Sequence, residues 1–72
     1  MNIEEGEIIT LHDGKEYIVV NIININNNIY MNLVSNFKPL KVMIVKADEI
    51  NGHLVLSEIS DQEELNLVLE KI

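Results

Sequence analysis

The sequence predicts an α+β fold: an antiparallel β-meander of four to five strands with one C-terminal amphipathic helix packed on one face. Runs rich in β-branched residues alternate with short turn-forming segments. No segment long enough for a helical crossover separates these runs, which excludes a parallel sheet. Near the C-terminus the apolar period changes to that of a helix. The chain of 72 residues is expected to form a single domain over residues 1–72.

The first two strands are predicted around the dipeptide Asp13-Gly14. Both residue types tolerate positive φ, which a two-residue type I′ turn requires. The flanking runs, residues 7–11 and 16–23, are rich in Ile and Val. Together they predict a β-hairpin.

The remaining strands are delimited by turn-forming residues. Asn dominates residues 24–28, and Asn accepts the left-handed backbone conformation. Pro39 cannot donate a hydrogen bond to a sheet. The sequence therefore predicts strands over residues 29–34, 40–47 and 53–59, separated by loops over residues 24–28, 35–39 and 48–52. Within the third strand, Ile29, Met31 and Leu33 are expected to share one face.

A helix is predicted over residues 61–71. Its apolar stripe has the i, i+3, i+4, i+7 spacing and consists of Leu65, Val68, Leu69 and Ile72. Two capping boxes are possible, Ser60 with Glu63 or Asp61 with Glu64. Such a short helix is marginal alone, so the stripe is expected to dock on the sheet. Leu67 falls roughly opposite Leu65 and is expected to stay exposed, where it could contact a partner.

The charge of the chain limits the partners it can have. The formal net charge is −7, and the only cations are five lysines. Nucleic-acid binders neutralise phosphates with clustered Lys and Arg, so direct nucleic-acid binding is not expected. An anionic membrane surface would repel the chain for the same reason. The expected partner is another protein, with a basic surface.

The cellular location is predicted from what the sequence lacks. There are no cysteines, so neither disulfides nor thiolate metal sites are expected. The N-terminal segment has neither the basic nor the apolar region of a signal peptide. No apolar stretch approaches the length of a membrane span. We therefore expect a cytoplasmic protein.

No group of residues in the sequence indicates catalysis, a metal or a cofactor. His12 and His53 are isolated from each other, whereas zinc motifs place their ligands at short fixed spacing. The segment 48–52 resembles a calcium loop only faintly and is interpreted as a polar turn. No glycine-rich phosphate motif is present. We therefore expect no enzymatic activity, no metal and no cofactor.

Carboxylates are the main collective feature of the chain. They gather toward its two ends, where their simpler roles are solubility and helix capping. The functional interpretation is an acidic surface that steers a basic partner. Phe37 either lies exposed on the second predicted loop or tucks under the sheet. The candidate partner-binding residues are therefore Glu4, Glu5, Glu7, Glu58, Glu63, Glu64, Phe37 and Leu67.

The order of these segments resembles a known family. The stretch Ile9–Val19 with its hairpin turn, Tyr30 in the third strand and the acidic helix start at 56–65 are similar to the YrzB-like family of small acidic bacterial proteins. The resemblance covers residues 8–69, although the middle region here is Asn-rich and lysine-bearing rather than acidic. That family is a domain of unknown function, so the resemblance implies a small cytoplasmic bacterial protein and no site residues.

These observations predict a small non-enzymatic protein-binding or regulatory module. The alternative is a phage or mobile-element inhibitor, similar in action to an anti-CRISPR protein, whose carboxylates imitate phosphates in the basic channel of a defence enzyme. A homodimer through an edge strand, such as residues 29–34, is compatible with either function.

Overall fold

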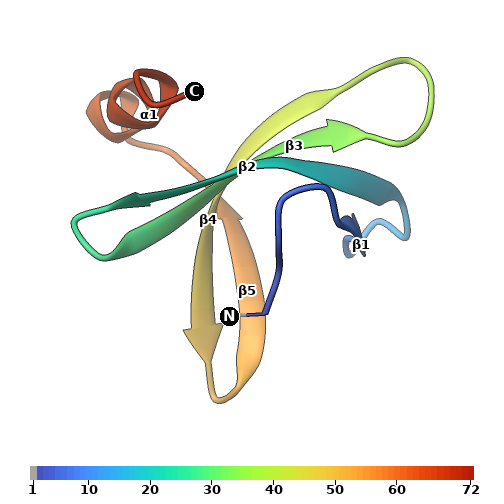
Figure 1. Ribbon diagram of the computed structural model, residues 1–72, viewed down its shortest axis with the longest axis horizontal. Helices are drawn as coiled ribbons and strands as arrows, with labels where there is room; N and C mark the ends of the chain where they lie inside the picture. The colour runs from blue at the N-terminus through green and yellow to red at the C-terminus, as the bar shows by residue number, and fades with distance from the viewer. Residues whose placement is uncertain (1) are drawn as a thin grey trace.

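The computed structural model describes residues 2–72, which form five antiparallel strands and one short C-terminal helix (Figure 1). This arrangement confirms the predicted α+β meander. The strands follow one another across the sheet in the order β1-β2-β3-β4-β5. The elements are β1 (Ile8–Thr10), β2 (Glu16–Ile25), β3 (Asn28–Ser35), β4 (Val42–Ile50), β5 (His53–Glu58) and α1 (Gln62–Leu69).

Two of the predicted loops are tight two-residue turns. The β2–β3 turn is Asn26-Asn27, with φ values of 51° and 66°. The β4–β5 turn is Asn51-Gly52, with φ values of 52° and 80°. Positive φ at both central positions is the type I′ geometry, whose twist matches that of the flanking strands. The strands therefore extend further than predicted, and most of residues 24–28 and 48–52 belong to them.

The β1–β2 hairpin has a different turn from the predicted one. Leu11 N donates to the carbonyl of Lys15 at 3.0 Å, which leaves three residues in the loop. Of these, only Gly14 has positive φ, at 77°. The Asp13 carboxylate instead accepts from Lys15 N at 2.8 Å and caps the loop locally. The predicted two-residue type I′ turn at Asp13-Gly14 is therefore wrong, because the carboxylate stabilises a longer loop.

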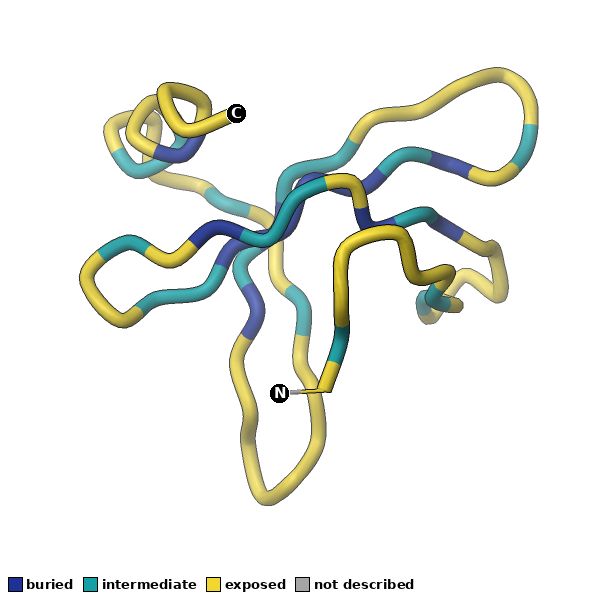
Figure 2. The backbone as a smooth tube through the Cα atoms, in the orientation of Figure 1, coloured by how far each residue is buried: buried dark blue, intermediate teal, exposed yellow. Residues whose placement is uncertain are grey.

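A register shift in β2 lets the sheet bury side chains on both faces. The pairing with β3 skips from Val19 to Asn21, so Val20 lies in a bulge. Because of the bulge, Ile22 lies on the inward face of β2, and Ile23 lies on the opposite face. The central strand β3 is consequently buried on both sides (Figure 2).

The larger core lies on one face of the curled sheet. Met31 and Leu33 are fully buried in it and Ile29 packs against it, as expected for one face of this strand. Phe37 and Leu11 cover part of its boundary. Its buried members are Tyr17, Val19, Met31, Leu33, Val45 and Ala47.

A smaller cluster on the opposite face includes one residue of the helix. Val68 is fully buried against Ile23 and Tyr30. The predicted stripe is wrong at its C-terminal end, because Leu69 and Ile72 are 48% and 51% exposed. The helix has only eight residues and ends at Leu69, so its last apolar residues do not reach the sheet.

The two edges of the sheet are β1 and β5. Residues 29–34, suggested above as an edge strand, lie instead in β3 at the centre of the sheet, between β2 and β4. The four successive antiparallel connections place the first and last strands outermost. β1 and β5 are therefore the two outermost strands that could pair with another chain.

Candidate functional site

A cavity of about 280 Å³ lies between the tip of the β2–β3 hairpin and the first turns of α1. We call it the helix pocket. Three carboxylates line its helical side, and amide and apolar side chains line its strand side. Its lining residues are Ile25, Asn26, Asn28, Tyr30, Asp61, Glu63, Glu64 and Leu67.

The start of the helix positions the acidic side of this pocket. Asp61 is the N-cap, and its carboxylate accepts a hydrogen bond from Glu63 N at 3.0 Å. Of the two capping residues considered, the structure therefore uses Asp61 rather than Ser60. Leu67 follows Glu64 by three positions and Glu63 by four, so it lies on the same side of the helix as both carboxylates. The same spacing places all three at the helix pocket.

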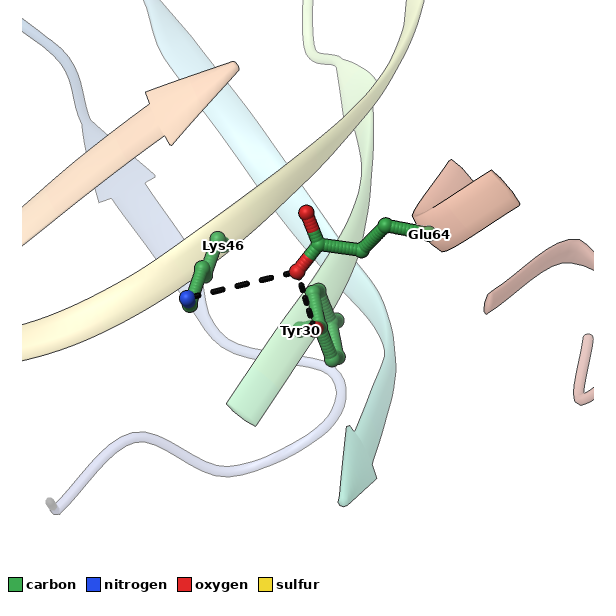
Figure 3. Close-up of polar contacts among 3 residues, drawn as sticks. All are labelled: Tyr30, Lys46 and Glu64. Atoms are coloured by element: carbon green, nitrogen blue, oxygen red, sulfur yellow. Dashed lines mark hydrogen bonds and ion pairs between the residues drawn. The ribbon is translucent and has the colours of Figure 1, made fainter. Parts of the chain in front are cut away.

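Glu64 is bound to the sheet. The Tyr30 hydroxyl donates to Glu64 Oε2 at 2.5 Å, and Lys46 Nζ lies 4.0 Å from the same oxygen (Figure 3). The hydrogen bond to this carboxylate, together with burial, raises the pKa of Tyr30 to about 12. The Glu64 side chain therefore joins α1 to β3 and β4, and only part of its acceptor capacity remains for a ligand.

The other lining groups suit a cationic side chain with an alkyl stem. Glu63 and Asp61 are exposed carboxylates that line the pocket. Leu67 is 49% exposed, and Ile25 is half-buried beside it. Carboxylates form strong charge-assisted hydrogen bonds with Lys and Arg, whose alkyl stems lie along apolar surface. The helix pocket can therefore accept such a side chain.

The acidic N-terminal residues lie elsewhere and are partly engaged within the protein. Glu5 Oε2 accepts a hydrogen bond from Ile22 N at 2.9 Å. The carbonyl of Glu7 accepts from Val19 N at 2.8 Å, while that of Glu4 accepts from Glu7 N. This segment thus continues alongside β2 next to its bulge. Of the predicted partner-binding residues, the pocket unites only Glu63, Glu64 and Leu67.

Phe37 tucks against the sheet, the second of the two positions considered for it. Its ring packs edge-on against Tyr17, with 5.5 Å between the ring centroids. Lys15 Nζ lies 5.2 Å from the centroid of the Phe37 ring. Phe37 therefore closes the core beneath the β3–β4 loop and offers only part of its surface to a partner.

A second, larger cavity lies beside the larger core, and we call it the sheet groove. Its volume is about 560 Å³, and residues of β1 face residues of β4 and β5 across it. Glu58, the remaining predicted partner-binding residue, lies at this groove. The sequence did not predict the groove, because only the curl of the sheet brings its first and last strands around one space. Its lining residues are Ile9, Thr10, Leu11, His12, Asp13, Met43, Val45, Leu54, Leu56, Ser57 and Glu58.

Three further findings concern the residues that the structure describes. Within residues 2–72, no group of three or more His, Cys, Asp or Glu side chains is arranged to hold a metal ion. No helix in this range has the length and apolar character needed to cross a membrane. Comparison with known protein families, curated proteins and solved structures finds no match to this chain. The resemblance to the YrzB-like family therefore stays a prediction.

Proposed function

We propose that this protein is a small non-enzymatic protein-binding or regulatory module whose helix pocket receives a Lys or Arg side chain from a basic partner. The observation that carries the proposal is the convergence of Glu63, Glu64 and Leu67 with Asp61 around one cavity. The net charge of −7 supports it, because a negative surface speeds encounter with a basic protein.

The charged group and the alkyl stem of the incoming side chain contact different residues of the helix pocket. Its charged group meets the carboxylates of Asp61 and Glu63, while Glu64 is shared with Tyr30. Its alkyl stem lies against Leu67 and Ile25. We infer further that α1 acts as an amphipathic helix docked on the sheet, since burial of Val68 and the Glu64 contact hold the acidic turn in place.

A direct test uses heteronuclear NMR and the tripeptide glycyl-arginyl-glycine amide as the probe. We expect chemical-shift changes concentrated at the β2–β3 turn and the first two turns of α1, weakening as salt is raised. The matched tripeptide with glutamate in place of arginine should leave these signals unchanged. Shifts spread evenly over all exposed carboxylates would contradict a defined pocket.

Substitutions can distinguish binding at the helix pocket from a general effect of negative charge. Glu63→Gln removes one exposed carboxylate and should weaken binding of the arginine tripeptide by up to about five-fold, the effect of an exposed ion pair. Leu67→Ala should also weaken it, through loss of contact with the alkyl stem. The matched control is Glu70→Gln, at the C-cap of the same helix and outside the pocket lining. Equal weakening by the Glu63 and Glu70 variants would overturn the assignment.

Identification of the natural partner then distinguishes a regulatory module from the alternative inhibitor. Affinity capture with the wild-type protein and the Glu63→Gln variant should yield a basic protein that the variant retains less well. If the captured protein is a nucleic-acid-binding enzyme and duplex DNA displaces it competitively, the inhibitor function is favoured. The described carboxylates divide among the N-terminal segment, the β1–β2 hairpin, the β4–β5 hairpin and the C-terminal segment around α1, which gives that alternative no specific support.

A further inference from the structure

The outer edge of β5 is long, apolar and without a partner strand. Among residues 2–72, β5 pairs only with β4, and it is the last strand of the sheet. It has six residues, whereas the opposite edge strand β1 has three. Leu54 and Val55 are 37% and 40% exposed. Natural sheets protect such edges with lysine, proline, bulges or shortness, and the sequence His53–Glu58 has no lysine or proline.

We propose that β5 pairs with β5 of a second copy of this chain, antiparallel and with the two-fold axis at Val55. An axis perpendicular to the sheet keeps each side chain on its own face, so residues of the same face must meet across the seam. In this register Leu54 faces Leu56 of the second copy, and Val55 faces its own counterpart. His53 then faces Ser57, a polar partner for a polar side chain.

Neighbouring registers lack this complementarity. If Leu56 faced its own counterpart, Leu54 would face the carboxylate of Glu58. If Leu54 faced its own counterpart, His53 would face Val55, and Leu56 would face Gly52. Cross-strand pairs contribute about 0.2–1 kcal/mol each according to their match, so the register centred on Val55 is favoured.

Charge complementarity agrees with the same register. The only carboxylate of β5, Glu58, falls opposite Gly52 of the second copy, so no like charges face each other across the seam. The nearest row of acids on β4 begins at Asp48, which pairs with Val55. Asp48 and its counterpart would be three strand spacings apart, about 14 Å. That separation exceeds the Debye length of about 8 Å at physiological salt, so their repulsion is largely screened.

The salt dependence distinguishes this contact from the proposed helix pocket. Repulsion between two chains of net charge −7 weakens as salt rises, so self-association should strengthen. Binding of a cationic side chain should instead weaken. The dimer uses β5 and none of the helix-pocket residues, so either proposal can fail without the other.

The first test is the mass in solution, measured by light scattering over a range of protein and salt concentrations. We expect wild-type protein to approach twice the 8.2 kDa of one chain as both concentrations rise. Val55→Lys should remain at the single-chain mass, because two ammonium groups would then face each other at the axis. The new lysine would lie opposite Asp48 within the hairpin, which supports folding. Val42→Lys, at a 61% exposed position on β4, is the matched control and should dimerise like wild type.

The second test locates the seam. Because the chain contains no cysteine, Val55→Cys introduces a single thiol whose crosslinking by a short bismaleimide reports the two-fold axis alone. It should crosslink at least about ten-fold faster than Val42→Cys, since pairing raises the effective thiol concentration. A wild-type protein that keeps the single-chain mass at every concentration, or equal crosslinking at positions 55 and 42, would overturn the proposal.

Discussion

The Tyr30 hydroxyl donates to the Glu64 carboxylate across 34 positions of the chain. This contact joins the centre of the sheet to the first turn of a helix of only eight residues. A helix of that length is unstable alone in water. Besides this bond, the burial of Val68 and the Lys46 ion pair hold it in place. The geometry of the helix pocket therefore depends on Tyr30.

Removing the Tyr30 hydroxyl should weaken the attachment of α1 to the sheet. Tyr30→Phe is expected to lower the free energy of unfolding by about 1.5–3 kcal/mol, the contribution of a hydrogen bond to a charged group. Urea denaturation measures this loss. Glu64→Gln tests the other side of the bond, and the double variant should be less destabilised than the sum of the two. Strict additivity would contradict a direct contribution of this bond to stability.

High pH should remove the same stabilisation. The pKa of Tyr30 is raised from 10.0 to about 12 in the folded state, so folding favours the neutral phenol. The contribution is fully present below pH 10 and is lost as the pH rises through 12. The difference in unfolding free energy between wild type and Tyr30→Phe should therefore shrink over this window. Tyr17 is common to both proteins, so its own ionisation cancels, and a constant difference would show that Tyr30 ionises normally.

The partly buried amide pair Asn21–Asn32 is expected to contribute little net stability. Asn32 Nδ2 donates to Asn21 Oδ1 at 3.1 Å, but Asn32 Oδ1 is buried and has no hydrogen-bond partner among the described residues. Asn21→Val alone should cost about 1–3 kcal/mol, since it leaves the second amide without an acceptor. Replacing both residues with Val should restore or exceed wild-type stability in thermal denaturation. A double variant less stable than the single one would contradict this.

The β1–β2 loop should depend on Gly14. Its φ of 77° is unfavourable for residues with a Cβ, while no atom lies within 4 Å of the position a Cβ would occupy. Gly14→Ala should therefore cost about 1–2 kcal/mol through backbone strain alone. Asn27, with φ of 66°, provides the matched control, because glycine accepts that conformation easily. Asn27→Gly should change urea denaturation little, whereas equal losses at both positions would contradict a strain effect.

Local sequence patterns were sufficient for the order and type of the elements. Strand propensity and short Asn- or Gly-containing connections predict an antiparallel meander, and the change of apolar period predicts the helix. These patterns depend only on residues close together in the sequence, so they can be recognised without knowledge of the tertiary structure. The hairpin turn was less predictable, because Asp-Gly suits both a type I′ turn and a longer loop. The Asp13 carboxylate, which bonds Lys15 N, stabilises the longer one.

The α+β meander, the acidic charge and a helix start rich in carboxylates follow from the amino-acid sequence alone. Which carboxylates share a cavity, which strand is an edge and where the apolar stripe ends depend on the tertiary structure. The bulge at Val20 turns Ile23 toward the helix, and the tip of the β2–β3 hairpin brings Ile25 near Leu67. These relationships join residues distant in the chain, so no local period encodes them. They follow from how the twisted strands bury both faces of β3 at once.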